Sequence, residues 1–277
     1  MDEYEDLESV DTIAQGDVLE WVGPHRKSPW HTYGVVVTAD CDLALGKHNG
    51  FISYIPAWIS RDFLWFQWRP EVLSPERDKA LRRMAIRLST WRKKNGGGNE
   101  FSDDAVKDWL RRVGGEKMLQ ELGVTDKGQQ NDLMKVIAPA KMLDDVLVCE
   151  EPSFSLLVEA YLHVKKDKNG LLDDVNRYLC NLPGDIFHIP STPDGGSDDL
   201  FLLLRHIRQL QADEISARPD DIRSGAAKAK RIARVSSPVR YAITQNLAKV
   251  FADIGLSDDY HDRRGTSARR LFDKLRA

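Results

Sequence analysis

The stretch GVVVTADCDL, residues 34–43, decides the fold, because a run of β-branched residues ends there in two carboxylates that flank a cysteine. The valines at 35–37 carry stiff, branched side chains that suit a strand buried on both faces. The polar triplet Asp40, Cys41 and Asp42 cannot stay in such an environment unpaired. We therefore predict a buried strand that delivers this triplet to the rim of a sheet.

Further strand-like segments lie on both sides of this stretch and again late in the chain. DVLEWV at 17–22 and FISYIP at 51–56 are bounded by Gly, Pro or Asn turn residues, as is the central segment at 33–39. Residues 184–190 alternate between apolar and polar side chains, and residues 200–210 are rich in Leu and Ile. We predict one long strand over 200–210, with a helix as the alternative.

Helical patterns fill the middle of the sequence and its carboxyl end. Ser74 is a plausible N-cap, Pro75 suits the first helical position, and apolar residues follow at spacings of three and four up to Trp91. The glycine-rich segment 95–99 predicts a connector, and residues 167–170 predict a turn. By the same criteria we predict further helices over 103–113, 116–122, 131–144, 153–165, from Pro238 to a stop at Gly255, and over 267–276.

These blocks predict an α+β protein: a small SH3-like β-barrel with a long helical insertion and a C-terminal helix. The loop-closure entropy of such an insertion grows by only about 0.6 kcal/mol per doubling of its length. The alternative is a barrel domain followed by a helical one. The predicted bounds are an acidic tail at 1–14, a barrel at 15–60 and 184–236, a helical insertion at 61–183 and C-terminal helices at 237–277.

Composition limits the class of protein. No apolar run approaches the roughly 20 residues needed to cross a bilayer, and the amino terminus is acidic where a secretory signal would be basic, so we expect a cytoplasmic protein without a membrane partner. The three cysteines are odd in number and widely spaced, which favours reduced thiols. Phosphate-binding glycine motifs, Gly-x-Ser-x-Gly elbows and kinase signatures are missing from the sequence.

Charge is strongly segregated along the chain. Residues 2–20 hold eight acidic and no basic side chains, whereas residues 77–94 hold eight basic side chains and one acidic one. A second basic stretch runs from Arg223 to Arg240. Such stretches neutralise nucleic-acid phosphates, form solvated helix faces or dock onto acidic partners. The candidate nucleic-acid-binding residues are Arg77, Arg82, Arg83, Arg87, Arg92, Lys93, Lys94, Lys230, Arg231 and Arg234.

The triplet after the central strand is the first candidate catalytic site. In an extended chain Asp40 and Asp42 point to the same side and could share a divalent cation, with Cys41 on the other side. Mg²⁺ takes one or two carboxylates together with phosphate oxygens, which suits metal-assisted phosphodiester chemistry. The alternative is a structural turn in which the aspartates accept backbone N–H groups and the cysteine fills the core.

Two other sets of residues could carry chemistry. Cys41 is a potential nucleophile if His25, His31 or His48 lies beside it, although the flanking carboxylates disfavour its thiolate. The late strands contribute a third set, in which an arginine and a histidine would suit phosphate binding and proton transfer. The members of that third set are Asp185, His188, Arg205 and His206.

Short motifs carry two resemblances. Gln15-Gly16-Asp17-Val18, the strand end at 38–43 and Ser237-Pro238-Val239-Arg240 resemble a group of uncharacterised bacterial proteins, which implies no established chemistry. The glycine–aspartate opening followed by a second hydrophobic strand is similar to the SH3-like barrels of PemK and MazF toxins, which are endoribonucleases. This second resemblance covers residues 1–60 and implies a small barrel.

Two functional hypotheses follow. The leading one is a non-enzymatic interaction or adaptor module of a bacterial multi-component system, in antiviral (antiphage) defence or a toxin–antitoxin arrangement, with another protein encoded nearby as its partner. Its basis is the separation of acidic and basic surfaces. The alternative is a metal-dependent nuclease or RNA-processing toxin in which Asp40 and Asp42 hold Mg²⁺ and the basic helix tracks the backbone of RNA or DNA. The sequence establishes no cofactor, and Mg²⁺ belongs to the nuclease hypothesis alone.

Overall fold

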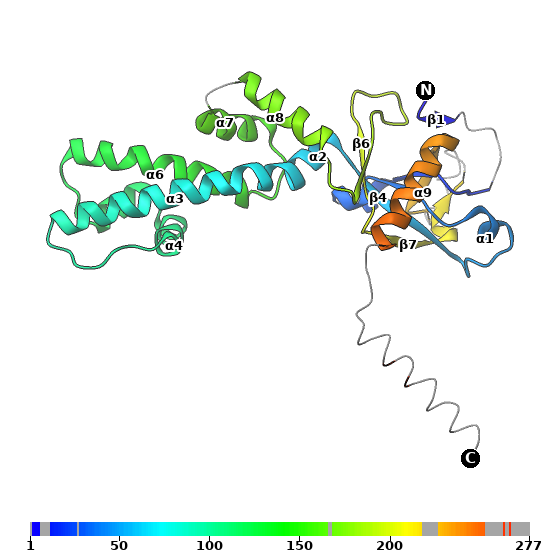
Figure 1. The fold of residues 1–277 in the computed structure, drawn as a ribbon, viewed down its shortest axis with the longest axis horizontal. Coiled ribbons are helices and arrows are strands. Elements are labelled where there is room, and N and C mark those ends of the chain that lie inside the picture. Colours follow the sequence, from blue (N-terminus) through cyan, green and yellow to red (C-terminus); the bar gives the residue numbers. More distant parts are fainter. Residues whose placement is uncertain are drawn as a thin grey trace, which may run out of the picture. The chain divides into compact units, whose positions relative to one another are not determined.

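The computed structural model describes residues 2–5, 12–26, 28–165, 168–217 and 227–252, together with residues 263 and 266. The chain splits into two compact units, which are described separately (Figure 1). The sheet unit comprises Met1–Trp58 and Pro183–Ala277, and the helical unit comprises Ile59–Leu182. Helices and a sheet therefore coexist, as predicted for the fold class. The predicted helix at 267–276, the stop at Gly255 and half of the acidic tail lie outside the described residues.

The sheet unit is built on one curled sheet that forms half of a barrel. The strand order is β1-β9-β2-β3-β4-β6-β5, with β7 on β4 and β8 on β9. The pairings with a described register are antiparallel, except for the parallel pair β8–β9. An SH3-like identity stays a prediction. The strands are β1 Tyr4–Glu5, β2 Asp17–Trp21, β3 Tyr33–Val36, β4 Phe51–Ile59, β5 Ile186–Ile189, β6 Leu200–Leu203, β7 Arg208–Gln211, β8 Ile215–Ser216 and β9 Ala229–Val235.

The short helical segments of this unit connect or flank the strands. A 16-residue helix, α9, follows β9 directly, as its Ser-Pro start predicts. Its first turn contacts the loop before β2, because the Arg240 guanidinium donates to the Gln15 carbonyl at 3.3 Å. The segments are the 3₁₀ turns η1 Gly23–His25, η2 Pro29–His31 and η4 Ala212–Glu214, and the helices α1 Asp40–Ala44 and α9 Ser237–Ala252.

Close packing between β2, β3 and β4 depends on one glycine. Gly34 of β3 pairs with Leu19 of β2 and Pro56 of β4. A Cβ atom at Gly34 would lie 2.7 Å from a Tyr54 ring carbon and 3.1 Å from the Trp21 ring. Only glycine therefore lets these two aromatic rings approach the strand between them.

The strand predicted over residues 200–210 is wrong as a single element. The structure has two strands there, β6 and β7, which a turn separates. The His206 N–H donates to the Leu203 carbonyl at 2.9 Å, and the Leu204 N–H donates to the Asp185 carbonyl at 2.9 Å. The polar residues Arg205 and His206 therefore mark a chain reversal, after which β7 pairs with the first four residues of β4.

The helical unit is built on two long helices, α3 and α6, against which shorter helices pack. α3 and α6 run alongside one another (Figure 1) and share a core with α4 and α5. A second core joins the start of α3 to α6, α7 and α8. The elements are α2 Ser60–Phe63, the π-helical segment η3 Leu64–Trp68, α3 Arg69–Lys94, α4 Asp103–Val113, α5 Gly115–Glu121, α6 Lys127–Val148, α7 Phe154–Lys165 and α8 Lys168–Cys180.

Two predicted boundaries in this unit are wrong. The helix expected to start at Ser74 begins earlier, and Pro75 lies inside α3. Trp65, Trp68 and Leu73 are buried in the core with α6 and α7, so packing outweighs the local cap signal. The turn expected at 167–170 is also wrong at its described residues, because 168–170 begin α8. By contrast, the predicted helix over 103–113 is confirmed, and the Ser102 hydroxyl caps it by accepting the Ala105 N–H.

Candidate functional site

A pocket of about 550 Å³ opens on the sheet unit. Its walls come from β2, the two 3₁₀ turns that follow β2, Tyr54 of β4, strand β7 and the residue before β9. Its lining contains cationic and imidazole groups but no carboxylate. The lining residues are Trp21, His25, His31, Tyr54, Arg208, Gln209, Leu210 and Lys228.

Two aromatic rings form the floor of the pocket. The ring centroids of Trp21 and Tyr54 lie 4.9 Å apart, and both residues belong to the core of the sheet with Leu210. Burial raises the pKa of the Tyr54 hydroxyl, and the nearby charge of Arg208 partly opposes that rise. The hydroxyl therefore stays protonated at neutral pH and is available as a hydrogen-bond donor.

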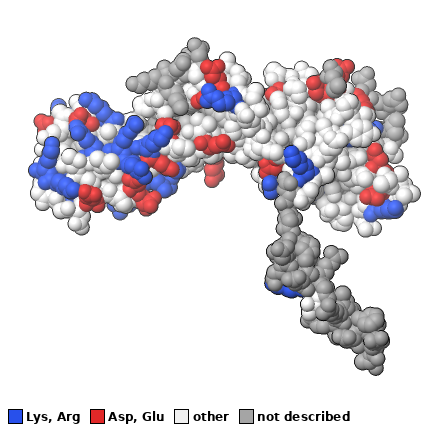
Figure 2. Space-filling view, viewed as in Figure 1, with Lys and Arg blue, Asp and Glu red and all other residues white. Residues whose placement is uncertain are grey.

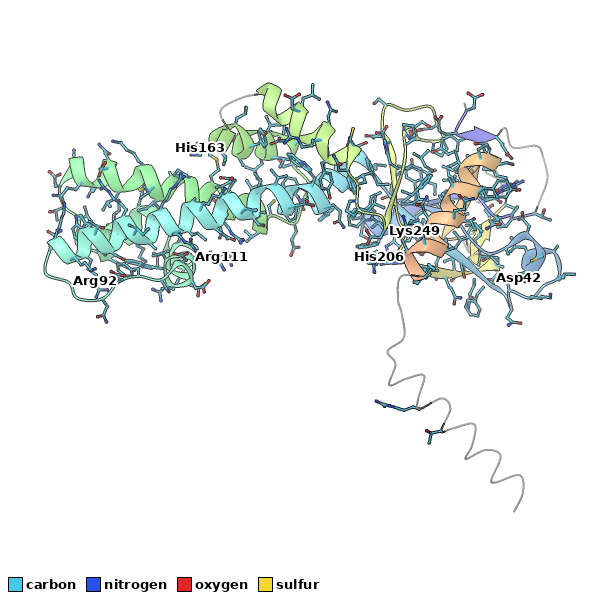
Figure 3. The ribbon with its side chains drawn as sticks, viewed as in Figure 1. Asp42, Arg92, Arg111, His163, His206 and Lys249 are labelled. Atoms are coloured by element: carbon cyan, nitrogen blue, oxygen red, sulfur yellow. The ribbon has the colours of Figure 1, made fainter. Side chains whose placement is uncertain are left out.

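Arg208 is the main positive charge of the pocket. It pairs directly with Tyr54 across the β4–β7 ladder, so the sheet fixes its backbone. Its guanidinium lies over the ring of Trp30, with the central carbon 4.7 Å from the ring centroid. The Trp30 ring makes edge contacts with two other rings. Its centroid lies 4.7 Å from that of Trp58 and 4.9 Å from that of His206, and Figure 3 labels His206. This stacked arrangement restricts the guanidinium before any ligand arrives.

The charge of Arg208 is not balanced locally. Among the described residues no carboxylate forms an ion pair with it. Lys228, the other cation of the lining, is already paired with Glu214. The pocket therefore offers an anion one guanidinium that no described carboxylate neutralises and one ammonium that is shared with Glu214.

His31 supplies a neutral imidazole beside Arg208. Partial burial lowers its pKa below the ordinary value of 6.5, and the positive charges of Arg208 and His25 lower it further. Its Nδ1 lies 3.1 Å from the Ser28 hydroxyl, and its ring is 5.9 Å from that of Trp21. At neutral pH His31 is therefore a hydrogen-bonding group and not a third cation.

The Asp40-Cys41-Asp42 triplet lies elsewhere on the sheet unit, and the extended chain predicted for it is wrong. The ladder of β3 ends at Val36, because the Val37 and Thr38 N–H groups both donate to the Ser53 carbonyl. Asp40 then begins the short helix α1, where Figure 3 labels Asp42. Residues two apart in a helix point roughly 200° away from each other. The extended geometry on which the shared-cation prediction rests is therefore not found there.

Asp40 instead has a structural contact of the kind that the alternative interpretation predicts. Its Oδ1 accepts the Gln15 N–H at 2.7 Å, and its Oδ2 lies 3.8 Å from the Arg240 guanidinium. Cys41 does not fill the core, because it is exposed, and its thiol lies 3.8 Å from the Asp42 carboxylate. Within the described ranges, no three His, Cys, Asp or Glu side chains are grouped so that they could hold a metal ion.

The other predicted sets are also divided among separate contacts. His31 bonds to Ser28, and the Nδ1 of His48 accepts the Gly50 N–H. In the third set, Arg205 pairs with Asp185 at 2.6 Å and His188 pairs with Asp199 at 2.9 Å. Only His206 of that set reaches the surroundings of the pocket, through Trp30.

The cations of β9, predicted to bind nucleic acid, form ion pairs within the sheet unit. Asp17 is fully buried and lies 2.7 Å from the Arg234 guanidinium and 3.7 Å from that of Arg231. Arg231 is only 3% exposed and donates to two backbone carbonyls. Lys230 pairs with Glu20 of β2 at 2.9 Å. These charges pair β9 with the acidic edge of β2, and little of Arg231 is left for a ligand.

Most cations of the predicted basic helix likewise have acidic neighbours. Figure 2 shows basic and acidic side chains side by side over this part of the helical unit. In the described part of the chain, Arg83 and Lys94 form no ion pair. Arg92 lies over the Phe101 ring at 5.0 Å. The ion pairs include Arg77–Asp78 at 2.8 Å, Arg82–Asp103 at 3.5 Å, Lys93–Glu100 at 2.5 Å, and Arg87–Asp132.

Sequence reasoning missed the pocket because its residues come from six separate segments. Arg208 was hidden inside a segment predicted as one long strand, and Trp30 lies in a proline turn without a motif. The one available signal was the concentration of all seven tryptophans in the first 109 residues. That signal does not distinguish core from ligand-binding rings.

No described helix combines the length and the apolar character needed to cross a membrane. Comparison of the chain with known proteins finds no matching family model, no matching curated protein and no matching solved structure.

Proposed function

We propose that this chain is a non-enzymatic interaction module whose sheet unit binds a nucleotide unit of single-stranded nucleic acid in the pocket around Arg208. One observation carries the proposal. Arg208 lies over Trp30 without a neutralising carboxylate, beside a neutral histidine and above an aromatic floor. A phosphate and a base together match this combination of a fixed cation and ring surfaces.

The chemistry of each part supports a nucleotide over a simple anion. A guanidinium forms two parallel hydrogen bonds to a phosphate, and Trp30 keeps that group oriented. Gln209, exposed on the wall, and the neutral His31 provide donors and acceptors for a base edge. The volume of about 550 Å³ lies within the range of small-ligand sites. Bases reach such a pocket only when they are unpaired, which favours a single strand over a duplex.

Fluorescence anisotropy with labelled oligonucleotides of about ten residues tests this proposal. We expect oligo(U) or oligo(dT) to bind with salt-dependent affinity and a duplex of the same length to bind more weakly. Arg208→Ala should weaken single-strand binding at least about tenfold, the equivalent of about 1.4 kcal/mol.

Arg205→Ala is the matched control. It removes the same charge at a position three residues from Arg208, and the Arg205 side chain is paired with Asp185. It should change affinity less than about twofold. Equal losses in both variants would reduce the effect to general charge attraction and overturn the pocket as the binding site. The absence of binding by the wild-type chain at low salt would overturn the proposal itself.

A further inference from the structure

The helical unit carries a second concave surface, which is mainly apolar. A groove of about 640 Å³ lies among α5, α6 and α7 and reaches the end of α4. Its apolar lining includes the partly exposed Met134, Met142 and Leu156, together with the exposed Ala138. Methionine side chains are flexible and polarisable, so they adapt to the shape of an incoming apolar surface.

The wall that α5 contributes is held firmly against α6. Gly114, at φ +76°, makes the sharp corner between α4 and α5. A Cβ atom at Gly115 would lie 2.6 Å from a side-chain carbon of Ile137, which is itself fully buried. The two helices therefore approach as closely as a glycine allows, which fixes the α5 wall of the groove against α6.

Charges at the rim indicate the chemistry of the occupant. Glu116 of α5 and Glu159 of α7 form no ion pair with any described cation. Lys141 is already paired with Asp145 of the same helix, which leaves Lys117 as the remaining basic residue of the lining. An occupant that lies between Glu116 and Glu159 is therefore favoured if it brings positive charge to both sides.

We propose that this groove receives an amphipathic helix of a partner protein, with its apolar stripe on Met134, Met142 and Leu156 and its basic residues facing Glu116 and Glu159. Its walls are helices, whose backbone groups bond internally, so they give an extended peptide no ladder to join. A helix instead satisfies its own backbone and presents side chains at i, i+3, i+4 and i+7. The proposal concerns the helical unit alone and does not depend on nucleotide binding by the sheet unit.

The test uses the full-length chain and two synthetic peptides of about 18 residues with helical periodicity. One peptide consists of Leu and Lys, and the other has Glu in place of every Lys. Fluorescence anisotropy of the labelled peptides should show saturable binding of the Leu/Lys peptide and at least about tenfold weaker binding of its acidic counterpart.

Two double variants separate the groove from general charge attraction. Glu116→Lys with Glu159→Lys should weaken binding of the Leu/Lys peptide at least about tenfold. Glu150→Lys with Glu151→Lys gives the same net charge at two exposed positions outside the groove and should change affinity less than about twofold. Ala138→Trp, which fills the groove from an exposed position, should also weaken binding, whereas Ala105→Trp on α4 should not.

Each contrary outcome overturns the proposal. Equal weakening in the two charge-reversed variants would show non-specific attraction, and equal affinity for the two peptides would remove the charge argument. A concentration-dependent dimer on gel filtration that Ala138→Trp dissociates would identify a second copy as the occupant. Circular dichroism of every variant at the assay temperature shows whether the helical unit is still folded, so that a loss of binding can be assigned to the groove.

Discussion

At the level of single residues, the absence of a side chain at Gly34 leaves room for the two rings that form the floor of the pocket. Gly34→Ala would place a Cβ atom 2.7 Å from the Tyr54 ring. We expect strain of about 1–3 kcal/mol, which outweighs the gain of about 0.4–1 kcal/mol from a less flexible unfolded chain. Urea denaturation should therefore show a less stable protein, and oligonucleotide affinity should fall because Trp21 and Tyr54 must move.

Gly184→Ala is the control for this change, because no atom lies within 4 Å of a Cβ there and the backbone does not have a positive φ. We expect its stability to stay the same or rise by up to about 1 kcal/mol. Equal destabilisation by the two substitutions would contradict the role that we assign to the contact between Gly34 and the two rings.

His31 makes stability depend on pH. Its folded-state pKa lies below 6.5, so as pH falls the unfolded chain takes up a proton before the folded chain does. The contribution of His31 to stability is thus complete above pH 6.5 and is lost as pH falls through the folded-state pKa. Urea denaturation at about pH 7.5 and about pH 5 should show that the stability difference between wild type and His31→Gln shrinks at the lower pH. A difference that stays constant or grows would contradict this assignment.

Among the elements, α4 and α6 are joined by one ion pair with a buried partner. The Asp144 carboxylate is 3% exposed and accepts from the Arg111 guanidinium at 2.5 and 2.7 Å. Figure 3 labels Arg111 on α4. We expect Asp144→Asn to lower the free energy of unfolding by about 1–3 kcal/mol, less than for a fully buried pair because the Arg111 side chain is 41% exposed.

Asp145→Asn is the natural comparison, since Asp145 is exposed and pairs with Lys141 one turn away. Such pairs contribute about 0.3–0.5 kcal/mol, so Asp145→Asn should change the free energy of unfolding measured by chemical denaturation very little. If the two substitutions had equal effects, the Arg111–Asp144 pair would not hold α4 against α6.

The same scale shows what the sequence could predict. β2, β3 and β4 were found because β-branched and aromatic residues lie between turn residues, and α4 was found because its cap and its apolar stripe agree. β9 was seen only as a basic stretch. Its inward positions alternate correctly, but Arg231 occupies one of them. This inward arginine is tolerated because it donates to two backbone carbonyls and lies 3.7 Å from Asp17, a partner more than 200 residues away in the sequence.

The candidate site was less predictable than the fold. The predicted triplet at 40–42 was conspicuous because its charges interrupt an apolar run, yet Asp40 mainly ties α1 to the loop before β2. The pocket, by contrast, consists of residues that look ordinary one at a time. Arg208 becomes distinctive only when β7 pairs with β4 and brings it beside Tyr54 and over Trp30. Such a site depends on tertiary pairing, which local patterns do not encode.

At the scale of the whole molecule, each unit has its own core. The two clusters of the helical unit draw on residues between 64 and 178, and the cluster around Trp21 belongs to the sheet unit. We expect calorimetry to show two unfolding transitions. Leu88→Ala, at a fully buried position, should lower the midpoint temperature of only one transition. The corresponding loss in the free energy of unfolding is about 2–5 kcal/mol.

Ile52→Val, in the core of the sheet unit, should lower the midpoint temperature of only the other transition. The loss in the free energy of unfolding should be smaller, about 0.5–1.5 kcal/mol. The excised segment 59–182 should also unfold cooperatively when circular dichroism follows its melting. A single transition that both substitutions shift together would show that the two units unfold as one.

The pairing of β2 with β9 sets an order of events during biosynthesis. Asp17 and Arg234 are 217 residues apart in the sequence. At a translation rate of about 5–20 residues per second, Arg234 is therefore synthesised roughly 10–40 seconds after Asp17. All of residues 59–182 leave the ribosome within that interval and can collapse onto their own cores. The inserted unit is therefore the first to mature on the nascent chain, and the sheet that brackets it is completed last.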